Sequence, residues 1–261
     1  MDLGLKGKIA VVTGGSRGIG IAVAREFLNE GANVAICARN RIELNAAAER
    51  LGGPERVFAQ SADMTREENV YAFADAVCAR FGKIDVWVNN VGAVVMRQSD
   101  EFTTADVDKI VELCFKSTLF GAQAAFRSMR CHASGAIVNI SSLAARCPTA
   151  GRSTLYGPMK AAVCNLTQTL AGEYAGYNVR VNCVLPGFTL TRAVRESIRE
   201  SEYNRNVSET LLQRGADPQE IAGPVVFLAG NRASFMTAEC IEVSGGRCRT
   251  LNPGYKLGDP L

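Results

Sequence analysis

The sequence predicts an α/β fold, a doubly wound parallel sheet of about seven strands with helices on both faces. Three observations predict it: short apolar runs alternate with helical patterns, a glycine-rich turn follows the first run, and the length suits one core. Parallel strands need long crossovers, which helices supply on both sides of a sheet. The 261 residues, 47% of them hydrophobic, can bury one large core, so we expect a single domain over 1–261.

Seven short apolar runs are expected to form the strands, and helical patterns lie between them. The strands are predicted at 9–12, 33–38, 57–60, 84–89, 136–140, 179–184 and 240–243. The clearest helical patterns are 22–28, 43–50, 67–81, 104–129, 161–174 and 218–228. The segment from about 188 to 216 is polar and lacks clear periodicity, so we expect a substrate flap there.

Charge and cysteine content narrow the range of partners. The net charge of +3 comes without a run of lysine or arginine, so we expect neither nucleic acid nor an acidic membrane surface as a partner. Nine cysteines are scattered singly, no C-x-x-C pair occurs and His132 is the one histidine, so a zinc site lacks ligands and no metal is expected. The odd cysteine count, the absence of a leader and the lack of a bilayer-length apolar stretch predict a cytoplasmic protein.

The first strand runs straight into a glycine-rich turn, Thr13-Gly14-Gly15-Ser16-Arg17-Gly18-Ile19-Gly20, and a helical pattern follows. In that order the orphan amide groups and the positive end of the helix face one small volume, which suits a phosphate. Glycines 14, 18 and 20 let the chain turn tightly and bring its backbone close to a pyrophosphate. Loops also collect glycine without binding anything, but the position after the first strand favours a dinucleotide site.

Tyr156 and Lys160 stand four residues apart, so on a helix they share one face. A nearby ammonium favours the phenolate, which makes Tyr156 usable as a general acid or base. Such pairs more often only pack and are solvated, but the glycine turn and Ser142 favour catalysis here. Because proline is tolerated only in the first turn of a helix, Pro158 predicts that this helix begins near Ser153 or Thr154.

Over nearly its whole length the chain resembles the short-chain dehydrogenase/reductase family, which has a Rossmann-type sheet. The resemblance rests on the glycine turn, Asp63, Asn89-Asn90-Val91-Gly92, Ser142, Tyr156-Gly157-Pro158-Met159-Lys160, and Pro186-Gly187 with Thr191. It implies that a hydride passes between a nicotinamide and a carbon bearing oxygen, while Tyr156 moves the proton. It further implies that Lys160 holds the nicotinamide ribose and that Ser142 hydrogen-bonds the substrate oxygen.

Two serines compete for the role beside the substrate. The family's serine usually stands thirteen residues before the tyrosine, whereas Ser142 stands fourteen before Tyr156, so either one residue is inserted within 143–155 or the register differs. Side chains alternate along a strand, so Ser141 and Ser142 are expected to face opposite ways and only one reaches the oxygen. We assign Ser142 to that role.

The end of the second strand indicates which cofactor binds. NAD enzymes usually place a carboxylate there for the ribose 2′-hydroxyl, whereas NADP enzymes supply a cation for the 2′-phosphate. Here Ala38 stands at the acidic position, Arg39 follows, and Arg17 adds a second guanidinium suited to phosphate. Either arginine alone is also typical of an ordinary solvated charge, but both together with the missing acid predict NADP(H).

The resemblance implies further cofactor contacts at the strand ends. Asp63 and Met64 resemble the residues that contact adenine, and Thr191 resembles the hydroxyl that meets the carboxamide. The full set expected to bind NADP(H) is Gly14, Ser16, Arg17, Gly18, Ile19, Gly20, Arg39, Asp63, Met64, Asn90, Gly92, Tyr156, Lys160, Pro186, Gly187, Thr189 and Thr191.

The chain departs from the family pattern in the long helix, where Cys114 occupies the place of an asparagine. In the family that asparagine is credited with kinking the helix and holding a water that links the lysine to solvent. A thiol is a weak hydrogen-bond partner. We favour the interpretation that Cys114 is a small buried apolar residue; a slowed proton relay or a specialised substrate is the alternative.

The segments expected to face the substrate are partly apolar. They comprise Val94-Val95-Met96, 143–155 and 188–205, and an apolar pocket suits a bulky alicyclic or steroid-like ketone or alcohol. The segments 184–187 and 253–260 are similar to bacterial hydroxysteroid dehydrogenases of the family. A 3-oxoacyl thioester reductase is the alternative, although no compact basic patch for an acidic carrier protein stands out in the sequence.

A different class also remains open, because some members of the family only bind NADP(H) and act as regulatory proteins. The retention of Ser142, Tyr156 and Lys160 favours an enzyme. The resemblance also implies a homodimer or homotetramer built through 104–129 and 161–174, although apolar faces on those helices are equally compatible with an internal core.

Overall fold

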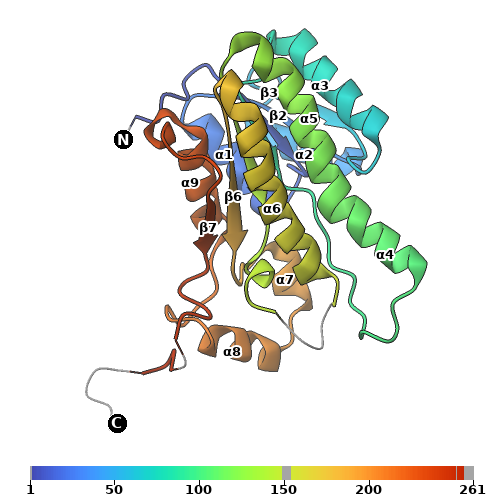
Figure 1. Ribbon diagram of the computed structural model, residues 1–261, viewed down its shortest axis with the longest axis vertical. Helices are drawn as coiled ribbons and strands as arrows, with labels where there is room; N and C mark the ends of the chain where they lie inside the picture. The colour runs from blue at the N-terminus through green and yellow to red at the C-terminus, as the bar shows by residue number, and fades with distance from the viewer. Residues whose placement is uncertain (1, 149–153, 251, 256–261) are drawn as a thin grey trace.

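In the computed structural model, which describes residues 2–148, 154–250 and 252–255, seven parallel strands form one sheet (Figure 1). The strand order is β3-β2-β1-β4-β5-β6-β7, and every described pairing is parallel. The predicted doubly wound sheet is therefore confirmed. The bounds are β1 Ile9–Thr13, β2 Asn33–Ala38, β3 Val57–Ser61, β4 Val86–Asn89, β5 Gly135–Ile140, β6 Val179–Pro186 and β7 Cys240–Val243.

Helices cover both faces of the sheet, and a buried apolar cluster lies on each side (Figure 1). Alternate residues of β1 contribute to the two clusters: Ala10 and Val12 pack with α1, α2 and α9, whereas Ile9 and Val11 pack with α3, α5 and α6. In the described part of the chain, no helix combines the length and apolar character that a membrane crossing needs. The bounds are α1 Gly18–Asn29, α2 Arg41–Leu51, α3 Glu67–Phe81, α4 Thr104–Val111, α5 Ser117–Met129, α6 Tyr156–Tyr174, α7 Arg192–Ser197, α8 Glu200–Ser208 and α9 Pro218–Ala229.

The long helix predicted over 104–129 is helical throughout but is not uniformly α-helical. A π-helical segment, Glu112–Lys116, separates α4 from α5. Two hydroxyls bond back to carbonyls four residues earlier at this point: Ser117 Oγ donates to Leu113 O (2.8 Å) and Thr118 Oγ1 to Cys114 O (3.0 Å). A local change of helical register is a common cause of a bend, and apolar periodicity alone does not reveal it.

The flap expected over 188–216 is not a plain loop. It contains α7 and α8, and its two ends are joined by a parallel bridge between Thr189 and Ala216. Within α8 the side chain that becomes buried is Asn206, whose Nδ2 donates to Glu202 O (2.7 Å) and whose Oδ1 accepts from Arg247 (2.8 Å). Because polar contacts rather than an apolar stripe hold α8, hydrophobic periodicity gave no sign of it.

Helix α6 begins later than the sequence predicts. Its first residue is Tyr156 and Leu155 is the N-cap, so Thr154 lies before the helix and Ser153 lies outside the described residues. Pro158 does fall in the first turn, as expected. The first amides of a helix need no internal partner, so proline fixes the start of a helix only to within one turn.

A chain of buried polar side chains connects the ends of β4 and β5 with α6. Asn89 Nδ2 donates to Asn139 Oδ1 (2.9 Å), and Asn139 Nδ2 donates to Thr167 Oγ1 on α6 (2.9 Å). Asn89 Oδ1 accepts from Trp87 Nε1 (2.7 Å). Helix α5 approaches this network so closely at Gly121 that a Cβ atom there would lie 2.0 Å from Asn89 Oδ1. The network therefore joins three elements beneath the site and requires glycine at position 121.

Candidate active site

The residues predicted for the site gather at the carboxyl ends of the central strands. Thr13 ends β1, Asn89 ends β4, and β5 ends at Ile140, directly before Ser141 and Ser142. The chain runs outward from β1 through β2 to β3 and then returns to β4 on the other side of β1. Ligands of open α/β sheets bind in the crevice at such a reversal of strand order.

The glycine turn between β1 and α1 has the geometry of a phosphate cradle. Gly14 and Gly18 have positive φ angles of 65° and 58°, in the region that favours glycine. A Cβ atom at Gly20 would lie 2.3 Å from the carbonyl oxygen of Gly14. Each of these three positions therefore excludes a larger residue for a geometric reason.

The amino end of α1 is left open for an anion. Its N-cap, Arg17, is extended and makes no side-chain capping bond, and the first turn holds no acidic residue. Ser16 is buried and Ile19 half-buried beside this end. Uncapped amides at the positive end of a helix attract a phosphate group, so the residues present fit a dinucleotide.

Asn90 fixes the position of the glycine turn. Its Nδ2 donates to Thr13 O (3.0 Å) and to Gly14 O (3.2 Å), and its backbone N–H donates to Thr13 Oγ1 (3.0 Å). The loop after β4 is thereby attached to the loop after β1, and the two sides of the predicted cofactor cleft form one rigid unit.

Lys160 lies at the junction of β5, α6 and the loop after β4. Its side chain is buried, with 3% of the residue exposed, and Nζ donates to Ile140 O (2.8 Å). The ammonium lies 5.8 Å from the centre of the Tyr156 ring. A Cβ atom at Gly92 would come within 3.1 Å of Nζ, so this glycine leaves room for the lysine. The structure thus brings Tyr156, Lys160 and Gly92 together, as the resemblance implies.

The two serines after β5 lie in different environments. Ser141 is buried, and its Oγ donates to the Lys160 carbonyl oxygen inside the protein (2.7 Å). Ser142 is half-buried, and its Oγ accepts from the N–H of Ala144 (3.2 Å). A hydroxyl that accepts one bond still has its own hydrogen to donate. This arrangement favours Ser142 as the serine that meets a ligand.

Cys114 lies in the π-helical segment and is fully buried. Its Sγ donates to the carbonyl oxygen of Ala93 (3.3 Å), in the loop that follows β4. The thiol therefore packs as a small residue and also makes one weak hydrogen bond. The helix changes register here without the family's asparagine.

We expect Cys114→Asn to leave turnover unchanged or to raise it. The amide of asparagine is a stronger donor than the thiol and can serve the same Ala93 carbonyl. Steady-state kinetics on the variant test this, with the unfolding midpoint as a check that the larger side chain is accommodated. A collapse of activity in a stably folded variant would show that the thiol has a role of its own.

The residues expected to hold the adenine end of the cofactor follow β1, β2 and β3 in the sequence. Arg17 and Arg39 are both exposed, and Thr13 and Cys37 are paired where their strands end. The Asp63 carboxylate accepts from the N–H (3.0 Å) and hydroxyl (2.9 Å) of Thr65, two residues further along.

Met64 is buried next to Cys37, whose Sγ lies 3.4 Å from its sulfur. Burial raises the pKa of Cys37 to about 12, so this thiol stays neutral under the cleft.

The start of the flap reaches the glycine turn. Thr191 is the N-cap of α7, and its Cγ2 would lie 3.4 Å from a Cβ atom at Gly18. Pro186 is the last residue of β6, and a Cβ atom at Gly187 would lie 2.7 Å from Ser244 Cα. Thr189 is buried and its hydroxyl donates to Gly187 O (3.2 Å), so in this arrangement it serves the flap itself.

Comparison with known proteins shows which family the chain belongs to. A family model described as enoyl-(acyl carrier protein) reductase matches residues 14–247. The chain belongs to the short-chain dehydrogenase/reductase family. Enzymes of this family are oxidoreductases that use a nicotinamide cofactor, and the glycine cradle described above fits that group.

The relatives of this chain have names that differ in their substrates. A 3β-hydroxysteroid dehydrogenase of Eggerthella lenta is 35% identical, over 97% of this chain and 98% of its own. A 3-oxoacyl-[acyl-carrier-protein] reductase of Chlamydia pneumoniae is 33% identical, over 94% and 99%. A tropinone reductase homolog of Arabidopsis thaliana is 35% identical, over 93% and 92%. These names place the chain among short-chain oxidoreductases without fixing its substrate.

Sequence reasoning missed the polar network under the site. Asn89 and Asn139 were available as signals, because Asn89 ends an apolar strand, Asn139 interrupts one, and a buried polar residue in a strand needs a partner. The requirement at Gly121 was not visible, because it depends on how closely α5 approaches the sheet.

Proposed function

We propose that this chain is an NADP(H)-dependent oxidoreductase that interconverts a carbonyl and a secondary alcohol. The observation that carries the proposal is the placement of Lys160 Nζ, held by Ile140 O at 2.8 Å and lying 5.8 Å from the Tyr156 ring, beside the glycine cradle. A tyrosine and a lysine held together on one face of a helix can place the phenol hydroxyl where it passes a proton to or from a substrate oxygen.

Each polar side chain has a part in the proposed reaction. A nicotinamide held at the glycine cradle would supply the hydride for the carbonyl carbon, or take it up in the reverse direction. In reduction the Tyr156 hydroxyl gives its proton to the oxygen as the alcohol forms, and Ser142 donates a hydrogen bond to the same oxygen. Lys160, whose ammonium lies 5.8 Å from the Tyr156 ring, would hold the ribose of the cofactor. The glycine cradle and Asn90 hold the cofactor in a fixed orientation.

The preference for NADP(H) is supported by the residues around the end of β2. Ala38, its last residue, offers no carboxylate to a ribose 2′-hydroxyl, and Arg39 follows it. Arg17 lies in the turn after the neighbouring strand β1. Two exposed guanidinium groups near paired strand ends suit a 2′-phosphate.

We expect Ala38→Asp to move the preference from NADP(H) toward NAD(H). The new carboxylate repels the 2′-phosphate and accepts from the 2′-hydroxyl, a charged hydrogen bond of about 1.5 to 3 kcal/mol, or about 10- to 100-fold in the ratio of kcat/KM values. Kinetics with both cofactors measure the ratio. Ala46→Asp, which adds the same charge at an exposed position of α2, is the control and should leave the ratio unchanged. An unaltered ratio in Ala38→Asp would contradict the assigned position of the 2′ group.

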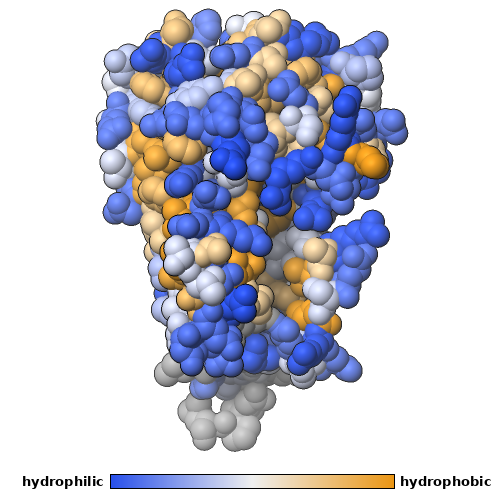
Figure 2. Space-filling view, turned by 90° about the vertical axis from the view of Figure 1, so that its right-hand side faces the viewer, coloured by the Kyte–Doolittle hydropathy of each residue, from blue (hydrophilic) through white to orange (hydrophobic). Residues whose placement is uncertain are grey.

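For the substrate we propose a bulky apolar alicyclic or steroid-like ketone or alcohol. Val94 and Met96, in the loop after β4, are exposed large hydrophobic side chains. Figure 2 shows a hollow with hydrophobic walls on the side of the molecule along which α4 and α5 lie. The 3β-hydroxysteroid dehydrogenase of Eggerthella lenta supports this class. Positions 149–153 and 256–260, which the sequence also links to the substrate or to hydroxysteroid dehydrogenases, lie outside the described residues.

The alternative substrate is a 3-oxoacyl thioester, which the chlamydial relatives favour. A panel of steroid ketones, small alicyclic ketones and 3-oxoacyl thioesters, each assayed with NADPH and NADH, separates the two. Higher kcat/KM for steroid or alicyclic ketones supports the first class. Tight binding of NADPH without turnover of any carbonyl or alcohol would favour a non-catalytic regulatory protein instead.

We also propose a cytoplasmic homodimer or homotetramer, assembled through the helices spanning 104–129 and α6, with small molecules rather than nucleic acid or membranes as its partners. Buried cysteines such as Cys37, Cys114 and Cys183 are free thiols, which suits a reducing compartment. Light scattering on the purified protein measures the number of chains in the assembly.

A further inference from the structure

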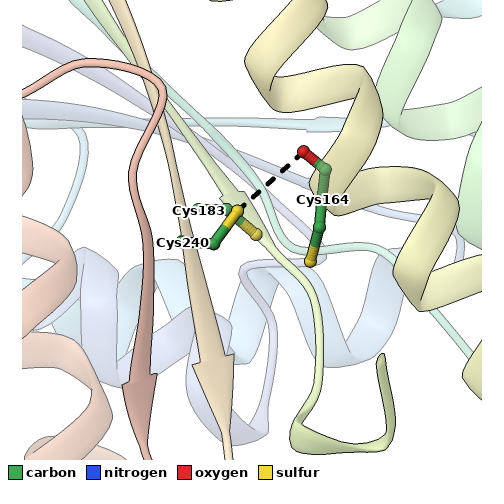
Figure 3. A group of neighbouring side chains, drawn as sticks. All are labelled: Cys164, Cys183 and Cys240. Carbon is green, nitrogen blue, oxygen red and sulfur yellow. Dashed lines mark hydrogen bonds between the residues drawn. The ribbon is translucent and has the colours of Figure 1, made fainter. Parts of the chain in front are cut away.

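Three cysteine side chains meet between α6 and the last two strands of the sheet (Figure 3). Cys164 comes from α6, Cys183 from β6 and Cys240 from β7, and their sulfur atoms all lie within 4.8 Å of one another. The nine cysteines stand singly in the sequence, but the fold brings these three together because it joins elements that lie far apart in the chain.

The fold brings the three thiols close together. Cys183 and Cys240 are direct partners in the parallel pairing of β6 with β7, so their side chains leave the same face of the sheet. Cys164 faces them from the helix that covers this part of the sheet, and its carbonyl oxygen accepts from Cys240 Sγ (3.9 Å). The cluster therefore rests on two strands and a helix rather than on mobile loops.

The spacing fits one metal ion. A zinc–sulfur bond is about 2.3 Å long, so two sulfurs on the same ion lie about 4 Å apart. Thiolates select soft cations such as Cu⁺ and Zn²⁺ over magnesium or calcium. We propose that Cys164, Cys183 and Cys240 form a binding site for one soft d¹⁰ metal ion, Zn²⁺ or Cu⁺. Three sulfurs complete a trigonal site for Cu⁺, whereas Zn²⁺ adds a water as its fourth ligand.

Access and charge also suit an ion at this place. Cys164 and Cys240 are half-buried, which gives an entry path, while Cys183 is fully buried and anchors the site. The thiols lose their protons to solvent as they bind, so the loaded site is negatively charged. Arg146 lies beside the site: its Nη2 donates to the Cys240 carbonyl oxygen (3.0 Å), and its Nη1 donates to Glu242 Oε1 (2.6 Å), so its positive charge is shared with that carboxylate.

The site lies directly behind the proposed active site. Cys164 follows Lys160 by one helical turn, and Ser141 joins them: its Oγ accepts from the Cys164 thiol (3.4 Å) and donates to Lys160 O (2.7 Å). An ion that takes the proton's place on Cys164 removes the first of these bonds. That link to turnover rests on the proposed function, whereas the metal site does not.

The test measures metal binding without any turnover, so it is independent of the proposed reaction. The protein is reduced with a phosphine and desalted without oxygen. It is then titrated with Zn²⁺, Cu⁺ or Mg²⁺ in separate experiments, and its metal content is measured after a second desalting step. We expect one Zn²⁺ or one Cu⁺ retained per chain and no Mg²⁺. Retention of Cu⁺ alone supports a three-sulfur site, and retention of Zn²⁺ supports a site completed by water.

Variants separate this site from adventitious binding at surface thiols. Cys164→Ser and Cys240→Ser are expected to weaken binding by more than about 100-fold, because even the loss of a ligand's outer partner weakens it by about 10- to 100-fold. Cys131→Ser, a matched change at an exposed cysteine outside the cluster, is expected to bind as the wild type does. These positions are chosen over the fully buried Cys183 so that the variants fold.

Thermal unfolding provides a second test of metal binding. Bound metal should raise the thermal unfolding midpoint of the wild type and of Cys131→Ser, but not of Cys164→Ser. No retained ion in the wild type would overturn the proposal. Equal retention by a Cys164→Ser, Cys240→Ser double variant would overturn it as well.

Discussion

Tyr156→Phe is expected to lower kcat by about 1000-fold, within the range of 10²- to 10⁴-fold that positioned acid–base catalysis contributes. The substitution removes the hydroxyl that we propose transfers the proton, and it keeps the ring that lies 5.8 Å from Lys160 Nζ. Binding of NADPH should change little, because the glycine cradle and Asn90 are untouched. Steady-state kinetics give the rate, and cofactor fluorescence gives the affinity.

Tyr177→Phe provides the matched control for this experiment. It removes the same hydroxyl from a half-exposed tyrosine just beyond α6, whose ring packs edge-on against Phe126 (5.1 Å between ring centres). Its turnover should equal that of the wild type. If Tyr156→Phe kept turnover within tenfold of the wild type, another group would have to supply the proton and the proposed mechanism would fail.

Gly121→Ala is expected to destabilise the protein by about 3 kcal/mol, from overpacking of about 1 to 3 kcal/mol and a displaced buried polar group of about 1 to 3 kcal/mol. The new methyl carbon would lie 2.0 Å from Asn89 Oδ1 and 2.9 Å from Trp87 Nε1. Asn89 cannot retreat without losing its bond to Asn139 (2.9 Å). With about 2 to 4 °C per kcal/mol for a domain of this size, the thermal midpoint should fall by roughly 10 °C.

Gly172→Ala is the control, because it makes the same change in another helix. Gly172 is exposed on α6, and apart from its neighbouring residues and the backbone of its own helix, no described atom lies within 4 Å of the place where its Cβ would stand. Alanine is the better helix former by up to about 1 kcal/mol, so this variant should be as stable as the wild type or more so. Equal midpoints for Gly121→Ala and the wild type would show that α5 has room to move away from the network.

The parallel sheet was predictable because its signals are local. Each strand is a short run of apolar residues, and the glycine turn follows the first of them, so pattern and order alone place β1 to β7. The placement of Tyr156 and Lys160 was predictable for a similar reason, since a spacing of four residues on one helix brings the two side chains together.

Features that depend on contacts between distant segments were not predictable from the sequence. Helix α8 is held by Arg247, which comes from beyond β7, and so it carries no apolar stripe of its own. The thiols of Cys164, Cys183 and Cys240 meet only because β7 pairs with β6 under α6. In each case the sequence contains the residues but no local spacing that relates them.

Lys160 is attached to the end of β5 in both directions. Its ammonium reaches back to the carbonyl oxygen of Ile140 (2.8 Å), and its own carbonyl oxygen receives the hydroxyl of Ser141 (2.7 Å). Neither of these two hydrogen bonds involves α7, α8 or the loop after β4, although that loop passes close to Nζ at Gly92. In the proposed reaction, proton transfer rests on the end of β5 and on α6, whereas Val94 and Met96, proposed to face the substrate, stand in a loop. Loop grafting from a relative with a different substrate should redirect specificity while the proton-transfer apparatus stays intact.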